Sequence, residues 1–274
     1  MGQFLVGILL PLLLLTAALL NWSLISLIDL LTFLFIQYAT SKGHSAWRHS
    51  FVSWYIIIFS LLVILSHIIC YIIWAFESEE WSSSNAWWAA LIGVRELSMR
   101  SSPVHVYYLV VQLLVAFVAL LNIYWRSFTL KSWRLYSWGH FSSSVENIGS
   151  HLRVACCLLL PVIQLIAGIS HPSWISLPFF ICSCVGLVDW SLTSNFSGLF
   201  RWWRPLLIYA GFNIVLLYIY QLPVQFPYTF QMVADIIGLY KVSVALEWPQ
   251  ICCSFSLLIF YFMVWFCCSL EVCY

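Results

Sequence analysis

The chain has 274 residues, of which 63% are hydrophobic and only 8% are charged. Soluble domains have about 25% charged residues, so this composition argues against a soluble enzyme or a soluble binding domain. The net charge of +1 argues equally against nucleic acid as a partner. We therefore expect an all-α protein that is embedded in a membrane.

Apolar runs that can cross a bilayer recur along the whole sequence. Asp29 is the only charged residue among the first 41, and Asp189 is the only charge between Arg153 and Arg201. A helix rises about 1.5 Å per residue, so each stretch spans about twice the hydrocarbon layer and must fold back as a hairpin. Runs of about 17 to 26 apolar residues are read as crossings. Eight are predicted: 4–20, 23–40, 51–76, 104–125, 154–170, 174–194, 203–221 and 252–270.

Three segments between the spans are predicted to lie in the membrane surface. The linker 127–150 contains Trp and basic residues, and an apolar stripe with helical spacing runs along it and just past its end. The stripe consists of Trp138, Phe141, Val145, Ile148 and Leu152. The loops 77–103 and 222–251 contain the partly apolar runs 89–95 and 235–241, which we predict to be short interfacial helices.

The Lys and Arg residues predict the orientation of the chain. With a cytoplasmic N-terminus, eight of them fall in inner loops and three in outer loops, as the positive-inside rule requires. The inner residues are Lys42, Arg48, Arg126, Lys131, Arg134, Arg153, Arg201 and Arg204, and the outer ones are Arg95, Arg100 and Lys241. Both termini are thus predicted to be cytoplasmic. The plasma membrane and the vacuolar membrane are the two expected locations.

A weak internal repeat appears when the sequence is shifted by 150 residues. Leu9-Leu10-Pro11 falls on Leu159-Leu160-Pro161, and the turn at Ser23 falls on the turn at Ser173. The shift predicts two tandem four-helix units, 1–126 and 151–274, joined by the linker 127–150. Because four is even, both units have the same orientation, unlike the inverted repeats of many transporters.

Charged residues within the predicted spans are candidate functional residues. Asp29 and Asp189 each cost about 3 kcal/mol near the centre of a span, which the surrounding Leu, Ile, Phe and Val residues can offset. The repeat places Asp29 opposite Phe179, so it does not pair the two carboxylates in a shared ion site. A structural polar contact between helices is favoured for both over an ion or proton site.

Aromatic and basic residues are concentrated at Arg201-Trp202-Trp203-Arg204, at the cytoplasmic start of a span. Two cations beside two amphipathic rings favour contact with phospholipid headgroups over a small-molecule site. The ten cysteines lack metal-binding spacings, and the histidines do not converge with a nucleophile. No catalytic, metal or cofactor site is predicted.

Several strings of residues together resemble the extreme N-terminus of plant Piezo-type mechanosensitive channels. They are Val6-Gly-Ile-Leu-Leu-Pro, Asn21-Trp-Ser-Leu-Ile-Ser-Leu-Ile-Asp, Trp138-Gly-His-Phe-Ser-Ser, Gly149-Ser-His-Leu-Arg-Val-Ala, Ile169-Ser-His-Pro-Ser-Trp, Gly186-Leu-Val-Asp-Trp-Ser and Leu199-Phe-Arg-Trp-Trp-Arg. The resemblance covers essentially the whole chain.

The resemblance implies a fold and a role. Piezo subunits are long arms of repeated four-helix units that end in a pore, and three subunits form a curved cation channel. The chain then corresponds to the distal part of one arm, stops at Tyr274 before any pore helix, and has lipids and the remainder of such a channel as partners. A small multi-pass transporter, a lipid-modifying membrane enzyme and an accessory subunit of a membrane complex are the alternatives.

Overall fold

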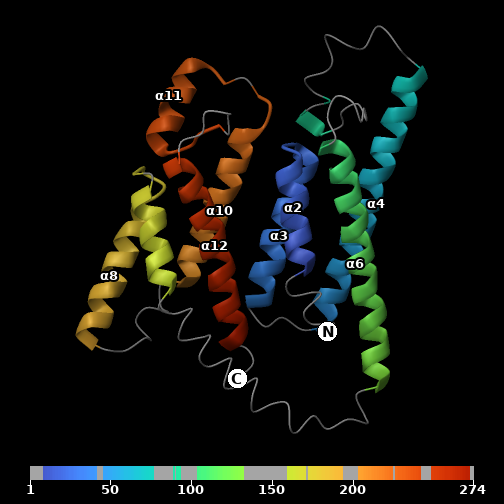
Figure 1. The fold of residues 1–274 in the computed structure, drawn as a ribbon. Coiled ribbons are helices and arrows are strands. Elements are labelled where there is room, and N and C mark those ends of the chain that lie inside the picture. The colour runs from blue at the N-terminus through green and yellow to red at the C-terminus, as the bar shows by residue number, and fades with distance from the viewer. Residues whose placement is uncertain are drawn as a thin grey trace. The chain divides into compact units, whose positions relative to one another are not determined.

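The computed structural model describes residues 9–41, 46–76, 89, 91–93, 104–132, 159–170, 172–193, 203–224, 226–241 and 248–271. This part of the chain is helical and contains no β-strand, which confirms the expected all-α class (Figure 1). The main helices are α2 (Leu10–Leu20), α3 (Leu24–Ser41), α4 (Ala46–Phe76), α6 (Val104–Ser132), α8 (Leu177–Thr193), α10 (Trp203–Gln221), α11 (Tyr228–Ile237) and α12 (Trp248–Glu271). A further helix covers Leu159–Ser170.

The chain separates into two compact units. The first comprises Met1–Ala39, His44–Ser137 and Leu222–Val224, and the second comprises Thr40–Gly43, Trp138–Gln221 and Gln225–Tyr274. The first thus contains α2, α3, α4 and α6, and the second contains Leu159–Ser170, α8, α10, α11 and α12. Each unit is described by itself below.

In the first unit, α2 and α3 form a hairpin whose ends are set by local chemistry. Pro11 lies in the first turn of α2, where a missing backbone N–H costs nothing, and α2 ends at Asn21 in an extended conformation. The Oγ atom of Ser23 accepts a hydrogen bond from the backbone N–H of Ser26 at 3.2 Å, which caps the start of α3. A core of Ala17, Val63 and Tyr108 then joins α2, α4 and α6.

In the second unit, Leu159–Ser170 and α8 form the corresponding hairpin. Ser173 Oγ accepts from the backbone N–H of Ser176 at 3.3 Å, as Ser23 does for Ser26. Gly168 permits a close approach, because a Cβ atom there would lie 2.9 Å from Cβ of Phe180. Packing of α10 against α11 is centred on four buried residues: Ile175, Tyr220, Ala234 and Leu239.

Two predicted helix ends are wrong. The helix α6 continues to Ser132, beyond the predicted span 104–125, because no Gly or Pro interrupts it after Trp125. The domain boundaries at 126 and 150 stay predictions. The predicted interfacial helix 235–241 is displaced: α11 covers Tyr228–Ile237 and ends at Gly238, whose φ of 102° is left-handed. The rest of the linker lies outside the described residues.

The side chains are distributed as in a membrane protein. Large apolar residues are exposed along the helices, for example Phe51, Ile58 and Leu62 of α4, whereas polar residues such as Asp29 and Gln112 are buried. Two helical stretches, Phe51–Ile73 and Val104–Tyr124, are long and apolar enough to cross a bilayer. Six shorter apolar helices accompany them: Leu10–Leu20, Leu24–Ala39, Leu159–Ser170, Leu177–Asp189, Pro205–Gln221 and Gln250–Met263.

Candidate functional site

A buried carboxyl group lies between α3 and α6 in the first unit. Asp29 on α3 is 0% exposed, and the Nε2 atom of Gln112 on α6 donates a hydrogen bond to its Oδ2 atom at 2.6 Å. Gln112 is also 0% exposed. This contact joins two helices whose interacting residues are 83 positions apart in the sequence.

Tyr108 completes this site, one helical turn before Gln112. Gln112 Nε2 lies 3.2 Å from the Tyr108 hydroxyl oxygen, and the Tyr108 hydroxyl is hydrogen-bonded to the carboxyl of Asp29. All three side chains are fully buried. We call Asp29, Tyr108 and Gln112 the polar centre.

Two oxygen atoms of the polar centre have no hydrogen-bond partner in the described part of the chain. They are Oδ1 of Asp29 and Oε1 of Gln112, and both are inaccessible to solvent. Buried polar atoms are almost always paired, so each such atom calls for an explanation.

A second polar cluster lies where residues 91–93 meet the α2–α3 turn. The carbonyl oxygen of Gly93 accepts a hydrogen bond from Asn21 Nδ2 at 3.1 Å and lies 3.2 Å from His67 Nε2. Gly93 has a φ of 109°, and a Cβ atom there would lie 2.6 Å from Cβ of Ser23. Glycine is thus required by both conformation and space.

His67 connects this cluster to the polar centre. Its ring packs against the Tyr108 ring with a centroid separation of 5.8 Å, and its Nδ1 atom lies 2.9 Å from the carbonyl oxygen of Val63. Further along α6, Asn122 Nδ2 donates to Ser53 Oγ of α4 at 2.8 Å. Polar contacts therefore recur along the interior of the first unit.

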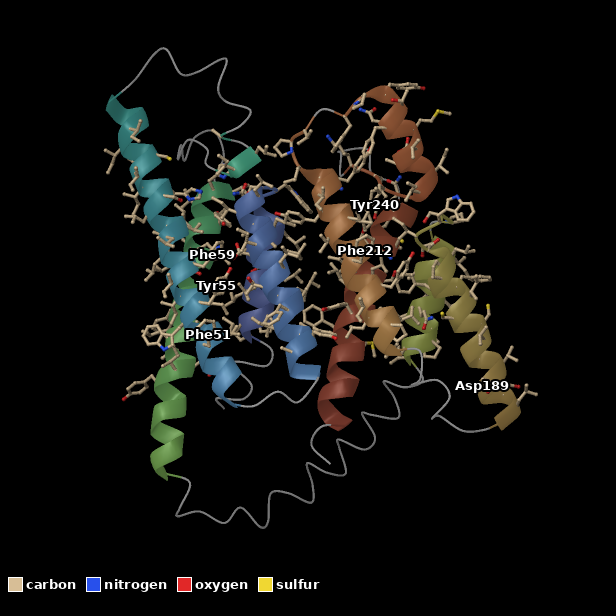
Figure 2. All side chains as sticks on the ribbon, turned by 180° about the vertical axis from the view of Figure 1, so that it is seen from behind. Phe51, Tyr55, Phe59, Asp189, Phe212 and Tyr240 are labelled. Atoms are coloured by element: carbon tan, nitrogen blue, oxygen red, sulfur yellow. The ribbon has the colours of Figure 1, made fainter. Side chains whose placement is uncertain are left out.

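The other predicted site residues do not join the polar centre. Asp189 is partly exposed and lies near the end of α8, in the second unit (Figure 2). Arg201 and Trp202 lie outside the described residues. Trp203 and Arg204 begin α10, and their side chains are likewise outside the described part.

Comparison with known proteins identifies the relationship. Over 265 residues, or 96% of its length, the chain is 51% identical to a Piezo-type mechanosensitive ion channel homolog from Arabidopsis thaliana. The resemblance to plant Piezo-type channels is confirmed. The chain spans 11% of the length of that relative. No protein-family model matches the chain, and no solved structure matches it.

Asp29 is predicted from the sequence as a candidate residue, but its partners Tyr108 and Gln112 are not. Tyr108 and Gln112 are spaced i, i+4 on one face of a span, and this pair of polar residues in an apolar run was the available signal. It was weak because tyrosines also occur at the ends of spans in membrane proteins generally, as part of the aromatic belt.

The polar centre can bind helices together, but it does not resemble a catalytic or metal site. Its one acidic residue is contacted by an amide and a phenol, and neither is a nucleophile with an activating base. Within the described ranges, no group of three or more His, Cys, Asp or Glu residues is placed to hold a metal ion. The site is consistent with the relationship to Piezo-type channels.

Proposed function

We propose that this chain forms the distal, membrane-embedded arm of a Piezo-like mechanosensitive cation channel. The observation that carries this proposal is the 51% identity to a Piezo-type mechanosensitive ion channel homolog across 96% of the chain. A chance match in apolar sequence does not extend over so long a stretch. We also propose that the chain is not an enzyme.

The proposed architecture has eight crossings in two like-oriented four-helix units, with both termini in the cytoplasm. The two α-helical units and their equivalent hairpins support it. Helices shorter than about 20 residues, such as α2, would cross a bilayer together with flanking apolar residues or where the bilayer thins. The membrane is the plasma membrane or the vacuolar membrane.

Tension is sensed through shape in this proposal. An array of tilted helices with apolar outer faces fits a curved bilayer better than a flat one, so flattening under tension shifts the population of conformations. The exposed apolar side chains of α4, such as Phe51 and Leu62, would contact lipid acyl chains. The free energy that opens the channel then comes from the change in contacts between the arm and the lipids.

Individual residues have supporting roles. Asp29 joins α3 to α6, Asp189 is structural, and the segment Arg201–Arg204 contacts lipid headgroups. The remainder of a Piezo-like channel, a trimer in the family, supplies the pore. We expect no ion conduction from these 274 residues by themselves.

A chimeric channel tests the proposal. The matching stretch of the Arabidopsis relative is replaced by this chain, and stretch-activated current is recorded in membrane patches. We expect current in the chimera and none from liposomes that contain the purified chain alone. Loss of tension sensitivity in a chimera that reaches the membrane, or stretch-activated current from the chain alone, contradicts the proposal. A chimera that carries a scrambled 204–274 segment is the control.

Topology is tested separately with accessible tags at residues 1 and 274. Both tags should be protected from an external protease in sealed, right-side-out vesicles and cleaved after permeabilisation. Tags on opposite sides would require an odd number of crossings and would exclude two four-helix units.

A further inference from the structure

The hydrogen-bond inventory of the polar centre is unbalanced. The Nε2 atom of Gln112 has two hydrogens, and it donates one to Oδ2 of Asp29 and the other to the hydroxyl oxygen of Tyr108. The hydroxyl of Tyr108 has one hydrogen, which it donates to the carboxyl of Asp29. If Asp29 is ionised, its Oδ1 atom and Gln112 Oε1 are two buried acceptors with no donor among the described residues.

We propose that Asp29 is a proton-binding site and that a proton completes the polar centre. As a neutral carboxylic acid, Asp29 gains an O–H donor at Oδ1. Gln112 Oε1 is an acceptor that otherwise has no donor among the described residues. The carboxylic acid and the carboxamide are then complementary, because each has one acceptor and one donor for the other. This inference concerns the first unit alone and does not depend on the channel assignment.

A proton fits this site better than a metal cation does. Ions such as Ca²⁺ and Mg²⁺ require about six or more oxygen ligands, whereas the polar centre has four oxygen atoms: two of Asp29, one of Gln112 and one of Tyr108. The hydroxyl of Ser26, one turn before Asp29, is already bonded to Ser23 in the α2–α3 turn. Within about one turn after the site, the buried side chains on the same helices are apolar and supply no further ligand: Leu30 and Phe33 on α3, and Val115 and Ala116 on α6.

In the described part of the chain, an amide and a phenol are hydrogen-bonded to the carboxyl, and neither neutralises a negative charge. The segment Leu10–Leu20 of α2 has no titratable residue. On α4, the titratable group His67 contacts Tyr108 through its ring and has both ring nitrogens beside backbone carbonyls. On α6 the titratable groups near the site are Tyr108 itself and His105, one turn before it. A bound proton removes the charge that burial in apolar surroundings disfavours.

The proton is taken up from water as the unit folds: the carboxylate of Asp29 and one solvent proton become the acid. The native state then holds one proton more at this site than the unfolded chain, whose aspartates ionise above about pH 4. Stability must therefore fall as pH rises above that value. Separation of α3 from α6 would release the proton, so any motion that opens this contact becomes sensitive to pH.

Infrared spectroscopy of the full chain in lipid bilayers tests the proposal. Carbon-13 labelling of aspartate affects only Asp29, Asp189 and Asp235, and a protonated carboxyl has a carbonyl band that a carboxylate lacks. At pH 7 we expect a label-sensitive carboxylic acid band that is lost in D29N and kept in D189N and D235N. If labelling moves no such band in the wild-type chain, or the band survives in D29N, the proposal is overturned.

A second measurement does not require that D29N give a resolvable spectrum. Stability of the wild-type chain in mixed micelles is measured between pH 5 and pH 8 and compared with D29N and D189N. The side-chain amide that D29N introduces has a permanent N–H donor in place of the bound proton. The decline of stability with rising pH should therefore be smaller in D29N than in the wild type, and it should be unchanged in D189N. Equal pH slopes in the wild type and D29N would show that no proton is bound at Asp29.

Discussion

The two units share the same kind of helical hairpin but differ in the buried side chains that pack against it. Some residues paired by the 150-residue shift are buried in both units: Leu10 and Leu160 are both buried, as are Ala17 and Ala167. The serine caps are also equivalent, with Ser23 bonded to Ser26 and Ser173 bonded to Ser176. The repeated positions therefore define the turn and the close helix–helix contact.

The interiors differ at the position of Asp29. The shift places Phe179 there, and Phe179 is fully buried between Tyr209, at a ring separation of 5.4 Å, and Phe260, at 5.5 Å in an edge-to-face arrangement. A hydrogen-bonded centre in the first unit thus corresponds to an aromatic cluster in the second. The comparison shows that the hairpin constrains the backbone while leaving the interior chemistry free to diverge.

The largest effect is expected from F179A. Removal of a fully buried ring leaves a cavity and abolishes two aromatic contacts, so we expect a loss of about 3–5 kcal/mol in unfolding free energy. Unfolding in mixed micelles, followed by circular dichroism, measures it. Phe212 on α10 is 59% exposed, and F212A should change stability by less than about 0.5 kcal/mol (Figure 2). Equal losses would show that Phe179 is not an internal anchor.

The polar counterpart is tested by Q112L. The substitution leaves the carboxyl of Asp29 without its amide partner, and we expect a loss of about 1–3 kcal/mol. In the double variant D29L/Q112L both polar groups are gone, so much of this stability should return. A double-mutant cycle of unfolding free energies measures the coupling. If the two single effects simply add, the contact between α3 and α6 is energetically irrelevant.

A smaller loss is expected from G168A, which tests the close contact in the second hairpin. The added methyl group would lie 2.9–3.0 Å from Cβ and the backbone of Phe180, which cannot move without shifting α8. Overpacking costs about 1–3 kcal/mol and is partly offset by the better helix propensity of alanine, for a net loss of about 1 kcal/mol. The exposed neighbour Ile169 supplies the control, because I169A should be nearly neutral in the same unfolding assay.

Sequence periodicity and composition predicted most helices because long apolar runs leave few alternatives to helix in a membrane. The predicted span 203–221 coincides with α10, and the predicted turns at Ser23 and Ser173 lie between helices. Composition could not predict where α11 ends, because the helix stops at Gly238, a left-handed residue within an apolar run. The partners of Asp29 left only the weak signal of the i, i+4 pair Tyr108 and Gln112, since Gln112 is distant in sequence from Asp29 and only packing brings it near.

The contact between Asn122 and Ser53 is the weakest of the polar contacts to be tested. Interhelical hydrogen bonds in membrane proteins contribute about 0.6 kcal/mol on average, because a partly unfolded chain in a bilayer finds other partners. We therefore expect S53A to lower unfolding free energy by about that amount. Ser66 of α4 bonds within its own helix, to the carbonyl of Val63, so S66A is the matched control and should have a smaller effect. A loss in S53A as large as in Q112L would mean that the first unit depends on its whole polar interior, and not chiefly on the contact at Asp29.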